Sequence, residues 1–126
     1  MITGGIAAGG TPILKVKVIG DRSEAMIEAI LDTGFDGALC IPITKAVPLG
    51  LELVDVWTSE LADGTILEDE PIFRGKVEWN GSVTDVDILL TKSADCLLGT
   101  VLLRGMEVRL NYSTNEVWIE KNIKSD

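Results

Sequence analysis

Short apolar runs separated by turn dipeptides fill this 126-residue chain, and they constrain its fold more than any other feature. The run from Leu14 to Val18 alternates apolar residues with lysines, as a strand with one buried face does. The dipeptides Asp63-Gly64 and Asn80-Gly81 each separate two such runs, and both favour the positive φ angles of a type I′ hairpin turn. The pattern predicts an all-β domain, a small closed barrel or sandwich built mainly from antiparallel strands.

Helical signals are weak throughout the sequence. The best helical candidate is the single turn from Val101 to Arg104, which Gly105 ends, and it is the one short helix we expect. The stretch from Ile43 to Leu49 also allows a helical turn, but Pro48 limits it. We expect one domain over residues 13–120, a flexible Gly-rich segment over 1–12 and a tail over 121–126.

Charge and composition exclude several classes of function. The chain has 20 acidic and 11 basic residues, for a net charge of −9, so binding to nucleic acid or to an anionic membrane surface is not expected. It contains no histidine, which removes Ser-His-Asp and Cys-His nucleophile systems and the commonest zinc ligand. Acid–base chemistry must therefore depend mainly on carboxylates.

The two cysteines and the apolar runs indicate the setting of the protein. Cys40 and Cys96 both have apolar neighbours, which is typical of buried structural thiols, and two such ligands do not complete a metal site. No apolar run is long enough to span a bilayer, and the N-terminus lacks the features of a signal peptide. A cytoplasmic location is the default expectation.

One tripeptide carries the chemistry. The apolar strand 29–31 runs directly into Asp32-Thr33-Gly34, and a carboxylate at the end of a buried strand is costly unless hydrogen-bond donors hold it. Taken alone, the tripeptide is also a common turn sequence. About sixty residues later comes Leu97-Leu98-Gly99, followed by the short helical candidate. The hairpin with Asp63-Gly64 at its tip lies between the two motifs.

This order of motifs resembles the retropepsin-like aspartic proteases of clan AA, in particular their small prokaryotic single-domain members. The resemblance extends from Ile13 to Glu120, and it implies the closed β-barrel of the acid proteases. It implies that Asp32 is the catalytic aspartate, that Thr33 braces the active-site loops and that Gly34 lets substrate approach the backbone. It also implies that the hairpin is a flap over the substrate. The remaining residues that the resemblance assigns are Ala62, Asp63, Gly64 and Thr65 in the flap and Leu97, Leu98 and Gly99 beneath the active-site loop.

The chain departs from the retroviral and pepsin pattern at three positions. Phe35 follows the tripeptide where those enzymes have a small residue, and we expect Phe35 and Asp36 to border the substrate. Thr100 follows the second motif, which weakens the case for a polar tie from that position to Asp36. The flap tip carries an acid, Asp63.

Peptide hydrolysis by this route needs two carboxylates, and the chain offers one suitable loop. A twofold-symmetric homodimer supplies a second Asp32, because like residues meet across a twofold axis. Two carboxylates about 3 Å apart cannot both ionise, so they share one proton and act as general base and general acid. No metal or cofactor is required. We expect the strands Leu14–Ile19 and Glu116–Ile119 to leave open sheet edges for dimer formation, with Leu98 and residues 101–103 near the axis.

The sequence therefore favours a homodimeric aspartic endopeptidase that cleaves peptide or protein substrates. One alternative is a non-catalytic dimer of the same fold that binds extended peptides or a protein partner by strand addition. A third is a small β-domain with a structural or toxin–antitoxin-type partner. The intact Asp32-Thr33-Gly34 favours the enzyme, since a pure binding protein gains nothing from paired carboxylates.

Overall fold

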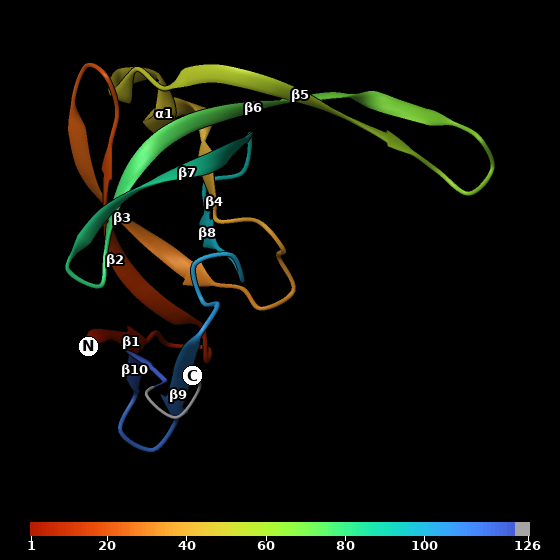
Figure 1. Cartoon of the computed structure of the whole chain (residues 1–126). Coiled ribbons are helices and arrows are strands. Elements are labelled where there is room, and N and C mark those ends of the chain that lie inside the picture. Colours follow the sequence, from red (N-terminus) through yellow and green to blue (C-terminus); the bar gives the residue numbers. More distant parts are fainter. Residues whose placement is uncertain (123–126) are drawn as a thin grey trace.

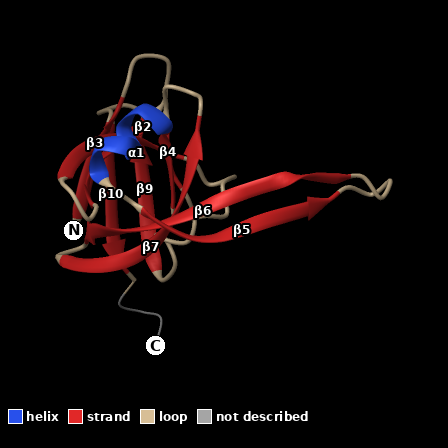
Figure 2. Ribbon diagram, turned by 90° about the horizontal axis from the view of Figure 1, so that it is seen from above, coloured by secondary structure: helices blue, strands red, loops and turns tan. Residues whose placement is uncertain are grey.

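The protein is all-β apart from one short helix, as predicted (Figures 1 and 2). The structure, a computed structural model, describes residues 1–122, and within them the side chains of 57–60 and 66–69 lie outside the description. The elements are β1 (Ile2–Ile6), β2 (Pro12–Ile19), β3 (Glu24–Leu31), β4 (Leu39–Pro42), α1 (Ile43–Leu49), β5 (Glu52–Glu60), β6 (Ile66–Trp79), β7 (Ser82–Thr91), β8 (Cys96–Leu98), β9 (Met106–Asn111) and β10 (Glu116–Lys121).

Six strands close into a barrel in the order β2, β3, β8, β4, β7 and β6. The ring closes because β2 pairs with β3 on one side and with β6 on the other, so that Val18 lies opposite both Ala25 and Val77. Leu14, Val16 and Val18 are buried in the core, which confirms the predicted alternation in this strand. Full closure removes open edges from these strands over the paired residues.

A short strand from late in the chain, β8, lies in the barrel wall between β3 and β4. β8 pairs in parallel with β3, placing Leu98 opposite Leu31, and in antiparallel with β4, placing Leu98 opposite Leu39. β3 and β4 are consecutive, and the Asp-Thr-Gly loop connects them. The loop therefore passes around the end of β8. This places Asp32-Thr33-Gly34 beside Leu97-Leu98-Gly99.

The helix does not lie where it was predicted. Residues 101–104 form hydrogen-bonded turns, in which the Leu103 N–H donates to the Thr100 carbonyl at 3.1 Å, and Gly105 has a φ of 73° that ends them too early for a helix. The helix is α1 instead, which Ala46 and Leu49 anchor in the core and which Gly50 ends in the left-handed conformation. Burial of one face therefore outweighs the helix-breaking effect of Pro48.

The ends of the described chain also differ from expectation. Residues 1–12 were expected to be flexible, but Ile2–Ile6 form β1, which pairs with both β2 and β10. The expected tail begins inside β10, and residues 123–126 lie outside the description. β2 and β10 were expected at open edges, and this is wrong, because each has a strand on both sides. The described edges of the sheet are β5 and β9.

Two hairpin turns with similar dipeptides fold differently. Asn80 and Gly81 have φ angles of 50° and 82°, which confirms the predicted type I′ chemistry. At the other tip only Gly64 has a positive φ, 86°, so the type I′ prediction is wrong there. The Gly64 N–H donates to the Leu61 carbonyl at 2.9 Å, which closes a three-residue loop with glycine at the left-handed position.

Both cysteines are free thiols in strands next to the Asp-Thr-Gly loop. Cys96 is buried, as expected, whereas Cys40 is only half-buried. Burial raises the pKa of each thiol, so both are predominantly protonated at neutral pH. The described part of the chain has no helix with the length and apolar character needed to cross a membrane.

Candidate active site

Backbone hydrogen bonds fix the loop between β3 and β4 to the chain around β8. The Asp32 N–H donates to the Leu98 carbonyl at 2.9 Å, at the point where β3 ends. Three backbone N–H groups of the chain that follows β8 also donate hydrogen bonds to the same loop. The loop is therefore held at both ends and in the middle. These bonds are Gly99 N–H to Ala38 carbonyl at 2.9 Å, Thr100 N–H to Phe35 carbonyl at 2.9 Å, and Val101 N–H to Gly37 carbonyl at 3.1 Å.

The Asp32 carboxylate is held by its own loop. Asp32 is half-buried, and its Oδ1 accepts a hydrogen bond of 2.9 Å from the Gly34 N–H. A Cβ added to Gly34 would lie 3.2 Å from Oδ1, so the glycine allows this close approach. Within the described part of the chain, no donor hydrogen-bonds the other oxygen, Oδ2. That oxygen is available to a water, a substrate or a second chain.

The Phe35 side chain packs against two glycines, one in its own loop and one after β8. Its ring lies against Gly37, where an added Cβ would be 2.6 Å from Cζ, and against Gly99, where an added Cβ would be 2.6 Å from Cδ2. The ring therefore occupies the space that side chains at these two glycines would take. Phe35, the bulky residue at which this sequence departs from the retroviral enzymes, fits here because Gly37 and Gly99 have no side chains.

The other predicted residues of this loop face solvent. Thr33 and Asp36 are exposed, and in the described structure of a single chain the Thr33 hydroxyl has no hydrogen-bond partner. Leu97 and Leu98 lie in β8, and Leu98 is fully buried beneath the loop. Among the described residues, no group of three or more Cys, Asp or Glu side chains is arranged to hold a metal ion.

A cleft of about 440 Å³ lies beside the loop. Its floor is apolar, with Leu39, Ile72 and Leu89, and its rim is charged. Arg74 and Asp87 form an ion pair on the rim, with Nη2 and Oδ1 3.0 Å apart, and both are about half exposed. Such a cleft can take an apolar or basic side chain. The other lining residues are Phe35, Asp36, Gly37, Ala38, Asp85, Val86 and Val101.

The hairpin that was predicted to be a flap is the arm formed by β5 and the first half of β6. Figure 1 shows this arm extending from the barrel on the side where the Asp-Thr-Gly loop lies, with its tip well away from the loop. Ala62, Asp63, Gly64 and Thr65 are all exposed, and among the described residues no atom beyond its chain neighbours lies within 4 Å of a Cβ added to Gly64. Hydrogen bonds from the Thr65 hydroxyl and backbone N–H lower the pKa of Asp63 and keep it ionised at the tip. The structure therefore does not bring the predicted flap residues and Asp32 together.

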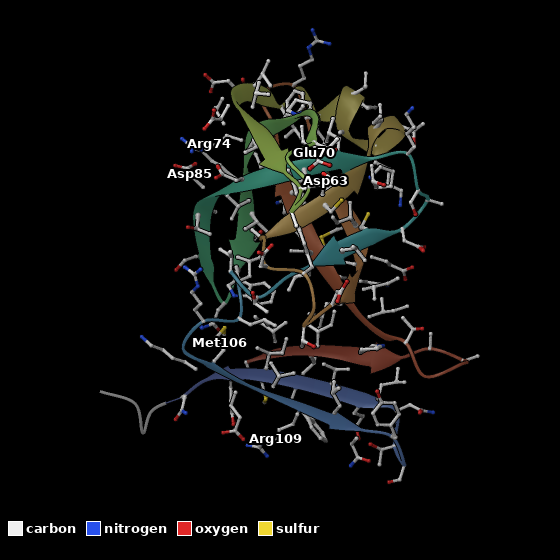
Figure 3. All side chains as sticks on the ribbon, turned by 90° about the vertical axis from the view of Figure 1, so that its right-hand side faces the viewer. Asp63, Glu70, Arg74, Asp85, Met106 and Arg109 are labelled. Atoms are coloured by element: carbon white, nitrogen blue, oxygen red, sulfur yellow. The ribbon has the colours of Figure 1, made fainter. Side chains whose placement is uncertain are left out.

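The charged rim of the cleft was not among the site residues predicted from the sequence. Arg74 and Asp87 lie opposite each other on β6 and β7, and Figure 3 shows Arg74 close to Asp85 on the same side of the barrel. A two-residue Asn80-Gly81 turn fixes the register of its hairpin, so the pairing of Arg74 with Asp87 follows from the sequence. What the sequence does not reveal is that this pair lines the same cleft as Asp36.

No family model matches the sequence, and no curated protein matches it either. One solved structure that resembles it is a retropepsin-like aspartic protease from Rickettsia conorii, with a TM-score of 0.60 and 17% sequence identity over 92% of this chain and 87% of that chain. At this identity the likeness establishes the fold alone. The protein has the retropepsin-like fold of the aspartic proteases, with Asp-Thr-Gly in the loop that β8 holds between β3 and β4.

Proposed function

We propose that this protein is an aspartic endopeptidase that acts as a homodimer, with Asp32 from each chain forming the catalytic pair. The observation that carries the proposal is the Asp32 carboxylate itself. It stands at the end of a buried strand, fixed through Gly34 and Leu98, with Oδ2 available. A rigid loop that presents a single carboxylate is what a twofold-symmetric catalytic pair requires.

The chemistry follows from two carboxylates that share one proton. The ionised member takes a proton from a bound water, and the resulting oxygen nucleophile attacks the peptide carbonyl carbon. The protonated member donates its proton to the carbonyl oxygen, which yields a tetrahedral diol. Proton transfer to the amide nitrogen then allows the C–N bond to break. The chain has no histidine to take over either role.

An inhibitor titration at acid pH tests this proposal. A catalytic pair that shares one proton should support hydrolysis on the acid side of neutrality and lose activity as that proton leaves at higher pH. We expect a pepstatin-type inhibitor to abolish cleavage of a peptide library at a stoichiometry of one inhibitor per two chains. Peptide binding without cleavage at any pH would instead favour the non-catalytic alternative, and activity that rises steadily above neutrality would contradict a shared-proton mechanism.

The flap tip offers a separate test through Gly64. We propose that the arm closes over bound substrate and excludes water from the catalytic pair. Replacing Gly64 by Val places a β-branched residue at a φ of 86°, which strains the turn although there is open space around it. Gly64→Asn is the matched control, since asparagine tolerates this conformation.

We expect Gly64→Val to reduce kcat/KM about tenfold or more while the melting temperature stays nearly unchanged, because the tip is exposed and far from the core. Gly64→Asn should stay close to the original protein in both measurements. Equal kinetics for all three proteins would mean that the hairpin is not a functional lid.

A further inference from the structure

The outer edge of β9 is an open sheet edge in the described structure. β9 pairs with β10, β10 pairs with β1, and β1 continues into β2, so β9 ends this side of the sheet in the described structure. β9 begins at Met106, five residues after Val101. The N–H groups of Thr100 and Val101 donate hydrogen bonds to carbonyl groups of the Asp-Thr-Gly loop. An unpaired strand edge is a template for another strand.

The other described edge, β5, is poorly suited to such pairing. It carries Glu52 and Asp55 and no basic residue, and its register with β6 shifts between Leu53 and Asp55. A second copy of β5 would place acids close to acids. β9, in contrast, pairs with β10 over six consecutive residues with no shift, and it carries one acid and one base.

The side chains of β9 separate by charge onto two faces. Met106, Val108 and Leu110 share a face with the buried Val117 and Ile119 of β10. Leu110 is 40% exposed, so this apolar face extends past the core of its own chain.

Glu107 and Arg109 lie on the opposite face of β9, where Arg109 Nε is 3.0 Å from Glu107 Oε1 and Arg109 Nη2 is 2.7 Å from Glu120 Oε1. Figure 3 shows Met106 on the side of the sheet that faces the barrel and Arg109 on the side that faces away.

Among the registers whose axis lies between Glu107 and Arg109, one allows β9 to pair well with a second copy of itself. With Val108 on the twofold axis, each Glu107 lies opposite the other chain's Arg109, and each Met106 lies opposite the other chain's Leu110. An axis at Arg109 or at Glu107 places like charges opposite each other, which is destabilising. An axis between two residues places apolar side chains opposite polar ones.

We propose that β9 pairs antiparallel with β9 of a second copy of this chain, with Val108 on the axis, to form a continuous sheet of β1, β10 and β9 from each chain. The pairing covers Leu110 and adds two cross-strand Glu107–Arg109 pairs. This inference rests on the proposed function in one respect, because the second copy is also what would supply the second Asp32. The strands that were expected to form the dimer contact, β2 and β10, have both edges occupied. In this proposal β9 forms the contact in their place.

Charge reversal tests the pairing without reference to catalysis. Sedimentation equilibrium of the full chain should give a monomer–dimer equilibrium. Arg109→Glu and Glu107→Arg should each raise its dissociation constant about tenfold or more, since each variant places two pairs of like charges opposite each other. The double variant restores opposite charges and should return the constant to within about threefold of the original. Lys17→Glu, on β2, changes the net charge as Arg109→Glu does and should leave the constant unchanged.

Three results would overturn the pairing: a chain that stays monomeric, single variants without effect, or a double variant weaker than both singles. Thermal unfolding of each variant checks that it is folded, because Arg109 also pairs within its own chain.

Engineered cysteines test the register independently. Residues directly opposite in an antiparallel pair have Cα atoms about 4.5–5.5 Å apart, within the range of a disulfide. Val108→Cys should therefore give a covalent dimer under mild oxidation. Leu110→Cys is the matched control on the same face, because the two copies of residue 110 would be roughly 14 Å apart along the strand. Non-reducing electrophoresis, with the original chain beside both, reports the result.

A crosslink at residue 110 without one at 108, or at neither position, would mean that the proposed register is wrong. Both association tests are separate from hydrolysis. If they succeed and no peptide is cleaved, the proposed enzymatic function fails and the β9 interface stands.

Discussion

The Asp32→Asn variant is expected to lose peptide hydrolysis while it remains folded and dimeric. Asparagine has nearly the same volume, and its Oδ1 still accepts the hydrogen bond that the Gly34 N–H donates at 2.9 Å. What is lost is the ionisable oxygen, so neither general-base nor general-acid catalysis remains. A loss of roughly a hundredfold or more in kcat is the scale of acid–base catalysis.

The measurement compares initial rates of peptide cleavage with thermal unfolding and sedimentation on the same preparations. Asp21→Asn is the matched control, since it makes the same chemical change in an exposed turn beside α1. Its kinetics should equal those of the original protein. Cleavage at the original rate by a pure Asp32→Asn preparation would rule out Asp32 as the catalytic residue.

The Gly99→Ala variant is expected to lose a large part of its stability. A Cβ at Gly99 would overlap the carbonyl oxygen of Gly37 and lie 2.5 Å from that of Phe35. These are backbone atoms of the Asp32 loop, so they cannot move aside as a flexible side chain does. Overpacking of this kind costs about 1–3 kcal/mol, and we expect a value at the upper end.

For a domain of this size the loss corresponds to a melting temperature roughly 10 °C lower. Gly5→Ala is the matched control, because a Cβ there would meet its nearest atom, the Asn115 carbonyl oxygen, at 3.7 Å. Differential scanning calorimetry of both variants should show a shift for Gly99→Ala alone. Adding Phe35→Ala should not rescue Gly99→Ala, since the carbonyl oxygens remain. A melting temperature for Gly99→Ala equal to that of the control would contradict the tight packing of the loop on β8.

The sequence by itself determined the features that depend on neighbouring residues. The alternation around Val16 specified a strand with one buried face, because side chains of a strand point to opposite sides in turn. Asn80 and Gly81 specified their turn, because both tolerate positive φ. The order of Asp32-Thr33-Gly34 and Leu97-Leu98-Gly99 was also enough to indicate the fold.

Only the tertiary structure decided the features that depend on partners far away in the sequence. The helix formed at Ile43–Leu49 because Ala46 and Leu49 found a core to pack against, which propensity alone does not register. Residues 2–6 became a strand because β2 and β10 offered edges to them, and the same pairing moved the open edge to β9. The position of Phe35 between Gly37 and Gly99 likewise joins two segments over sixty residues apart. Local patterns specify which face of a strand is buried, whereas the choice among pairing partners is made by the packing of the whole chain.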